Sequence, residues 1–176
     1  AGDHQGELVA QLTTLAGEVV ATHTLAISCS QQRVDFSLSN LTDIRLWDVD
    51  NPVLYQLNVN ICGTNFSHQF STRAGFRQVE FTAEGFLLNG RKLKLRGINR
   101  HQSYPYVGYA MGDHAQMADA DLIKNEFKFN LVRTSHYPQA PAFLDRCDEL
   151  GLLVFEEIPG WQHIGDEVWQ QGAITN

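Results

Sequence analysis

The sequence predicts a β-sandwich of the immunoglobulin type, followed by the first three βα units of a (β/α)8 TIM barrel. In residues 7–81 apolar and polar residues alternate between closely spaced turn residues, as in antiparallel strands with one buried face. Residues 94–159 contain three apolar runs separated by two stretches of helical spacing, and each run ends in polar, reactive side chains. We therefore expect residues 1–75 to form the sandwich, truncated at its N-terminus, and residues 76–176 to begin the barrel.

The strands of the first half are defined by period-two alternation. In residues 34–38 and 55–61 every second residue is apolar, which predicts two half-buried strands. Because no Cys–Trp–Cys spacing is present, only the sandwich architecture is predicted and not an antibody-like domain. Less regular strands are expected at residues 8–12, 19–27, 66–72 and 77–81.

Turn and cap residues define the elements of the second half. Asn89-Gly90 between two short apolar runs predicts a two-residue hairpin, which could close the floor of a barrel. A helix is predicted over 141–150, because a proline stands in its first turn and Gly151 follows its end. Another helix is predicted over 119–127 from apolar residues at helical spacing. These residues are Leu122, Ile123 and Phe127.

Composition excludes several classes of partner. The chain is 43% hydrophobic and 19% charged, as in ordinary globular proteins. Its net charge of -7 and its scattered basic residues argue against nucleic acid, and no apolar run approaches the roughly 18 residues of a membrane span. Cys29, Cys62 and Cys147 lack the spacing of a zinc site or disulfide framework and are interpreted as inert thiols. The N-terminus shows no leader pattern, and a cytoplasmic and a periplasmic or secreted location both stay open.

Three polar residues follow the three apolar runs at equivalent places. His101, His136 and Glu157 each stand at the end of a predicted strand, and the ends of neighbouring barrel strands share one rim. Two imidazoles, a carboxylate and the guanidiniums of Arg100 and Arg133 would hydrogen-bond a polyhydroxylated ligand. Two histidines and a carboxylate could also hold a metal ion, but neighbouring cations work against a divalent metal. No metal site is predicted.

Alternatives stay open for several of these side chains. In an extended strand Arg133 and His136 face opposite ways, so both point inward only if the strand end kinks. Glu156 and Glu157 also face opposite ways, and either carboxylate could form a structural ion pair instead of binding a ligand. Trp161 and Tyr104 lie beyond strand ends, where an aromatic ring can stack on a sugar or pack a loop.

Several segments of the chain resemble one known family. Residues 85–102, 130–138 and 147–157 resemble glycoside hydrolase family 2, which contains β-galactosidases and β-glucuronidases. Residues 47–57 and 73–78 look like the immunoglobulin-like domain of that family and its exit into the barrel. The resemblance implies a fragment of a retaining hydrolase that cleaves terminal β-glycosidic bonds, with β-galactosidase ranked before β-glucuronidase. A non-catalytic β-sandwich interaction or carbohydrate-binding module is the alternative function.

The resemblance also implies what this chain lacks. Retaining glycosidases use an acid/base and a nucleophilic carboxylate, and in this family the acid/base follows an asparagine after the fourth barrel strand. Asn125-Glu126 has the right dipeptide but lies in a predicted helix before the second strand. Both catalytic carboxylates are therefore expected outside the chain, which alone would be inactive.

The resemblance implies that the chain carries a substrate-binding shell for a β-galactoside or related carbohydrate. His101 and His136 would bind sugar hydroxyls, with Arg133 in support and Glu157 in an orienting role. Trp161 joins this candidate shell because of its place beyond a strand end, where its ring could stack on the sugar. No cofactor is expected, because Trp161-Gln162-His163 stands where magnesium-dependent galactosidases of the family carry Glu-x-His. An open sheet edge in a three-unit barrel further predicts association with a second copy.

Overall fold

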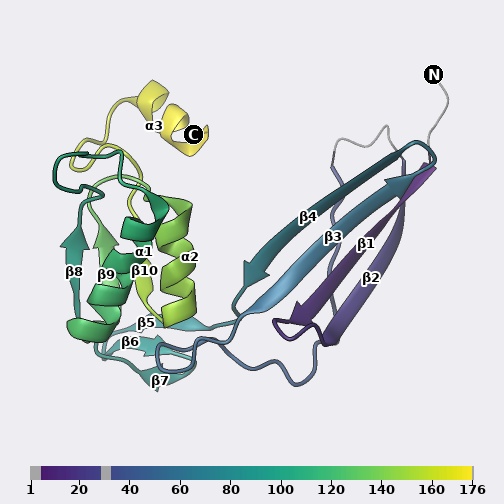
Figure 1. The fold of residues 1–176 in the computed structure, drawn as a ribbon, viewed down its shortest axis with the longest axis horizontal. Helices are drawn as coiled ribbons and strands as arrows, with labels where there is room; N and C mark the ends of the chain where they lie inside the picture. The colour runs from purple at the N-terminus through teal and green to yellow at the C-terminus, as the bar shows by residue number, and fades with distance from the viewer. Residues whose placement is uncertain (1–4, 29–32, 176) are drawn as a thin grey trace. The chain divides into compact units, whose positions relative to one another are not determined.

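The computed structural model describes residues 5–28 and 33–175, which form two compact units (Figure 1). The first unit contains the chain up to Trp47 together with Val53–Phe76, and the second contains Asp48–Pro52 and the chain from Arg77 onward. Among the predicted thiols, Cys29 lies outside the described residues, whereas Cys62 is a free, exposed thiol and Cys147 a free, buried one.

The first unit is built on a four-stranded antiparallel sheet (Figure 1). The strand order is β2-β1-β3-β4. Strand β1 lies between β2 and β3 and pairs with both along nearly its whole length. Leu8, Ala10 and Ile27 form the buried cluster on one face of the sheet. Four of the predicted strands are thereby confirmed. Their bounds are β1 Gln5–Thr14, β2 Val19–Ser28, β3 Tyr55–Gly63 and β4 Phe66–Ala74.

The strand predicted over 34–38 is wrong, although its side chains alternate as predicted. Residues 33–38 alternate between exposed and half-buried positions, and Val34 and Phe36 pack against the cluster of the sheet. The segment nevertheless belongs to no strand. Alternating polarity reports that one side of an extended segment is buried, which requires a neighbouring surface but not a hydrogen-bonded partner strand.

The second unit begins with a small antiparallel sheet, β5-β6-β7. The hairpin predicted at Asn89-Gly90 is confirmed, because both residues have positive φ (52° and 75°), as a two-residue turn of the favoured twist requires. Val79–Thr82 (β5) confirms the last predicted strand of the first half. The other two strands are β6 Gly85–Leu88 and β7 Arg91–Lys92.

A short turn from earlier in the chain also belongs to the second unit. The backbone amides and carbonyls of Asp48 and Asn51 bond each other reciprocally. Lys124 Nζ donates to the carbonyls of Val49 (2.6 Å) and Gly151 (2.9 Å), and Arg91 Nη2 lies 2.7 Å from Asp48 Oδ2. Two cations thus hold this turn against the unit that contains the candidate site.

The main sheet of the second unit consists of three parallel strands in the order β10-β9-β8 (Figure 1). The strands are β8 Gly97–Arg100, β9 Leu131–Thr134 and β10 Leu153–Phe155, and they confirm the three predicted apolar runs as parallel neighbours. Two helical segments cover one face of the sheet and bury a cluster that includes Val132, Phe143 and Cys147. The helices are α1 Asp113–Asp121, continued by a π-helical turn at Leu122–Glu126, then α2 Pro141–Leu150 and α3 Glu167–Thr175.

The two predicted helices have different outcomes. Pro141–Leu150 is confirmed with its bounds, and Gly151 ends it in the left-handed conformation (φ 74°). The other helix begins at Asp113, six residues before the predicted start, and its last turn is widened by a bond from the Phe127 amide to the Leu122 carbonyl. The widened turn keeps Ile123 buried but leaves Leu122 and Phe127 45% and 51% exposed, so only one of the three apolar residues at helical spacing lies in the core.

Among residues 5–28 and 33–175, no helix combines the length and apolar character needed to cross a membrane.

Candidate functional site

The two faces of the parallel sheet carry different kinds of side chain. On β8, Ile98 and Arg100 face the helices, and on β9 Val132 and Thr134 do the same and are fully buried. The alternate residues Asn99, Arg133 and Phe155 face the opposite side. There they line a cavity of about 270 Å³ together with Gly97 and Leu131.

The two predicted histidines meet at the carboxyl ends of neighbouring strands. The rings of His101, after β8, and His136, after β9, lie 5.5 Å apart between centroids and nearly perpendicular. The ring of Trp161 lies 5.0 Å from that of His136 at an interplanar angle of 31°, and its side chain is 64% exposed. The rim therefore presents two imidazoles beside the largely exposed indole ring of Trp161.

Glu157, which follows β10, joins two of the predicted residues. Its Oε2 lies 2.7 Å from His136 Nδ1, and its Oε1 accepts a hydrogen bond from Arg133 Nε. Strand β9 ends at Thr134, so the chain turns before His136, and both Arg133 and His136 reach the same carboxylate. The strand end is thus kinked, which was the condition set for both side chains to point inward.

The electrostatics of Glu157 favour its ionised form. Desolvation opposes the charge, since the side chain is only 15% exposed, but hydrogen bonds from His136 and Arg133 outweigh it and hold the pKa of Glu157 below its usual value. The backbone amide of Glu157 also donates to the buried Thr134 hydroxyl at 3.0 Å. Glu157 therefore forms the ion pair with Arg133 that was one of the open alternatives, while it also fixes the His136 ring.

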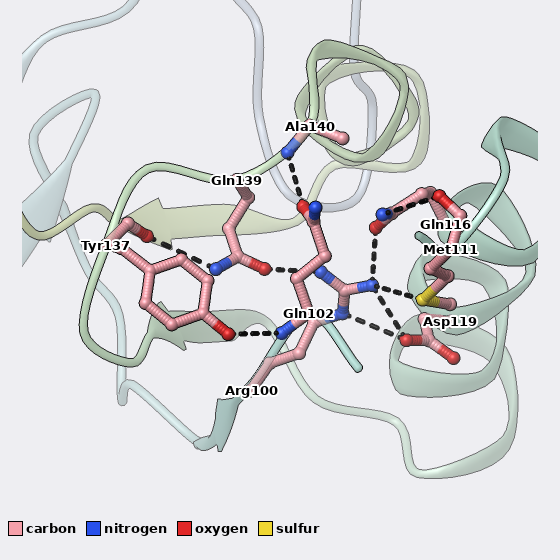
Figure 2. Close-up of polar contacts among 8 residues, drawn as sticks. All are labelled: Arg100, Gln102, Met111, Gln116, Asp119, Tyr137, Gln139 and Ala140. Atoms are coloured by element: carbon pink, nitrogen blue, oxygen red, sulfur yellow. Dashed lines mark hydrogen bonds and ion pairs between the residues drawn. The ribbon is translucent and has the colours of Figure 1, made fainter. Parts of the chain in front are cut away.

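Arg100 lies away from the rim, contrary to the hypothesis that its guanidinium joins the ligand-binding side chains. It is 5% exposed, and its Nε and Nη2 donate to Asp119 Oδ2 at 3.0 and 2.8 Å, while Nη2 also donates to Gln116 Oε1 at 2.7 Å (Figure 2). Its Nη1 donates to Gln139 Oε1, and its Cζ lies 3.9 Å from the centre of the Phe143 ring. Strand alternation explains the difference, because Arg100 shares the helix-facing side of β8 with Ile98.

A second set of bonds joins the loop after β8 to the turn after β9. The Gln102 amide donates to the Tyr137 hydroxyl at 3.1 Å, and the Ala140 amide donates to Gln102 Oε1 at 2.7 Å (Figure 2). Burial raises the pKa of Tyr137, so its hydroxyl stays protonated. Gln102 and Gln139 were not predicted from the sequence, because no sequence pattern distinguishes a glutamine that bonds within a loop from one that is exposed to solvent.

The remaining candidates take other places. Glu156 accepts a bond of 3.4 Å from the Gln139 amide, whereas Tyr104 is half exposed and bridged to Gly108 within its loop. Asn125 and Glu126 lie in the π-helical turn that precedes β9, as the helix prediction required. In the part of the chain that the structure describes, no three His, Cys, Asp or Glu side chains are grouped as metal ligands.

Comparison with known proteins shows the family to which the chain belongs. Residues 2–77 match the family described as "Glycosyl hydrolases family 2", and residues 79–173 match "Glycosyl hydrolases family 2, TIM barrel domain". The chain belongs to glycoside hydrolase family 2. The matches support a sandwich domain followed by the start of a TIM barrel; the three parallel strands alone do not close a barrel.

Two relatives and one solved structure show how similar the chain is to individual members of the family. The chain is 60% identical over 141 residues to a β-galactosidase of Thermoanaerobacterium thermosulfurigenes, covering 80% of this chain and 20% of that protein. It is 36% identical over 164 residues to a putative β-glucuronidase of Formosa agariphila, covering 92% and 20%. Among solved structures, the β-glucuronidase of Parabacteroides merdae matches with a TM-score of 0.81 at 30% identity, covering 95% of this chain and 21% of that one. The chain thus spans about a fifth of the length of these relatives.

Proposed function

We propose that this chain supplies part of the sugar-binding wall of a retaining β-glycosidase whose whole length resembles that of its relatives. The observation that carries the proposal is the convergence of His101 and His136 at one rim, with Glu157 joining His136 to Arg133. Imidazole nitrogens and a guanidinium fixed in this way can donate to and accept from the hydroxyls of a pyranose. The open face of Trp161 beside His136 would pack on the apolar face of the ring.

The proposed substrate is a terminal β-galactoside, with a β-glucuronide next. The relative named β-galactosidase is 60% identical, whereas the relative named putative β-glucuronidase is 36% identical. We also propose that the reaction retains configuration and uses two carboxylates, as the resemblance to the family implies. We propose that both carboxylates lie outside this chain. Asn125-Glu126 lies in a helical turn, and the Glu157 carboxylate is already bound by Arg133 and His136.

Each side chain at the rim has a distinct part in this proposal. Glu157 accepts from His136 Nδ1, which leaves His136 Nε2 free to turn toward a sugar hydroxyl. Arg133 balances the charge of Glu157 on the uncovered face of the sheet. The proposal gives no part to a metal ion and leaves magnesium as an open alternative for the intact enzyme, because Trp161-Gln162-His163 stands where the magnesium-dependent galactosidases carry Glu-x-His.

The test uses the intact enzyme that contains this segment. His136→Ala removes one proposed contact to the sugar, and we expect kcat/KM for a nitrophenyl β-galactoside to fall by about 1–3 kcal/mol of transition-state stabilisation. His68→Ala, in β4 of the first unit, is the matched control and should leave kcat/KM unchanged. An unchanged kcat/KM for His136→Ala would demote His136 to a structural residue. The 176-residue chain, purified from a host without β-galactosidase, should show no turnover, and turnover would favour catalytic carboxylates within it.

A further inference from the structure

The guanidinium of Arg100 is a buried charge directly beside a proposed sugar contact. Arg100 is the last residue of β8, and His101 follows it. A buried cation is costly unless its donors are paired. Here the donors reach Asp119, Gln116 and Gln139 (Figure 2). The planar group also lies over the Phe143 ring.

The hydrogen-bond acceptors Asp119, Gln116 and Gln139 of Arg100 come from two segments. Asp119 and Gln116 belong to α1, and Gln116 Nε2 in turn donates to the carbonyl of Met111 (3.3 Å), which precedes that helix. Gln139 belongs to the turn after β9, three residues beyond His136, and its Nε2 donates to the Tyr137 carbonyl at 3.2 Å. One side chain therefore connects the end of β8, the middle of α1 and the turn that carries His136.

The connection matters because Glu157 fixes only one of the two rings. Glu157 and Arg133 hold His136, whereas His101 follows β8 directly and its ring contacts those of His136 and Tyr137, at 5.5 and 6.1 Å between centroids. The spacing between the rings depends on how that backbone sits relative to the turn after β9. Arg100 and Gln139 join these two segments through side chains, and the bond from the Ser135 amide to the Arg100 carbonyl (2.9 Å) joins them through the backbone.

We propose that Arg100 is a positioning residue that sets the spacing of His101 and His136, and so acts on catalysis through the two imidazoles without touching the sugar. This inference rests on the proposed function. Lysine cannot replace Arg100, because a single ammonium cannot reach Asp119, Gln116 and Gln139 together in the planes that a guanidinium fork allows. Removing the acceptor on Gln139 should loosen the same connection while Arg100 keeps its partners on α1.

The experiment compares variants of the intact enzyme with a nitrophenyl β-galactoside. Arg100→Lys and Gln139→Met should each lower kcat/KM by roughly tenfold to a hundredfold, mainly through kcat, because misplaced contacts lose transition-state binding. Arg146→Lys is the matched control: Arg146 also joins helices through Asp121 (2.7 Å) and Glu149 (2.8 Å), but no strand end. It should cost stability without a change in kcat/KM. Thermal unfolding of each variant checks that the enzyme is folded.

A double-mutant cycle separates positioning from a general loss of structure. In a His136→Ala background only the His101 ring is left to place, so Gln139→Met and Arg100→Lys should each lower kcat/KM by a smaller factor than they do in the wild-type background. Equal losses with and without His136 would overturn the inference and show a role in overall folding. Full activity of Gln139→Met and Arg100→Lys alongside a large loss in His136→Ala would overturn it too, while leaving the proposed function intact. A silent His136→Ala would contradict the proposed function itself.

Discussion

Gly151→Ala should destabilise the second unit through one close contact that a matched glycine lacks. Gly151 has φ 74°, and a Cβ there would lie 2.4 Å from the Val49 carbonyl oxygen, which accepts the bond from Lys124 Nζ. Gly90 has nearly the same φ, 75°, in the same unit, but a Cβ there meets nothing within 4 Å. Gly90→Ala should therefore cost only the left-handed conformation of alanine, about 1–2 kcal/mol.

For Gly151→Ala the contact adds to that conformational cost. The Val49 carbonyl must move by about 1 Å to reach an ordinary van der Waals distance, which breaks or weakens a bond to a charged donor worth roughly 1.5–3 kcal/mol. The free energy of unfolding should fall by about 1.5–3 kcal/mol more than in Gly90→Ala. Urea unfolding followed by circular dichroism at the helical band reports this unit, since the helices in the described residues all belong to it. Equal losses in the two variants would refute the close approach of Val49 to Gly151.

Two further predictions concern ionisable groups. Because the pKa of Glu157 in the folded protein lies below its usual value, its interactions stabilise the fold above that usual value and are lost as pH falls through the lowered pKa. The urea midpoints of wild type and Glu157→Gln should therefore differ at neutral pH and converge as acid protonates Glu157, and a pH-independent difference would contradict this account. Burial, helped by the neighbouring Asp148, raises the pKa of Cys147 to about 12, whereas Cys62 is exposed. Iodoacetamide at about pH 8 should label Cys62 and spare Cys147 until the chain unfolds, as peptide mass spectrometry would show; comparable labelling of both in the native chain would be inconsistent with the burial.

Local rules predicted those elements that depend on local chemistry. Asn89-Gly90 and the pair Pro141 and Gly151 have conformational preferences that few environments override, and the hairpin and α2 follow them residue for residue. The segment 34–38 shows that alternating polarity alone does not predict a strand. Its apolar side chains pack against the sheet, but its backbone pairs with no other strand.

The residues of the candidate site that directly follow strands could be predicted from the sequence. The loop residues that bond to them could not. His101 and His136 meet because they follow adjacent parallel strands, which the repeated pattern of apolar runs already indicated. The contacts of Gln139 depend on how a turn folds over a buried guanidinium, and no spacing in the sequence encodes that. Arg100 lies between the two cases: strict alternation from Ile98 assigns it to the helix side, but its place beside His101 suggested the rim.

The widened turn at Leu122–Glu126 accommodates one more residue than a regular helix would use. Since each residue advances a regular α-helix by about 100°, deleting one position there would rotate the preceding part of α1 relative to β9. Asp119 and Gln116 would then swing off the side that meets Arg100, although neither had been changed. An indel far from the rim, at the other end of the helix, is thus a route by which relatives of this chain could alter the rim without a substitution in it.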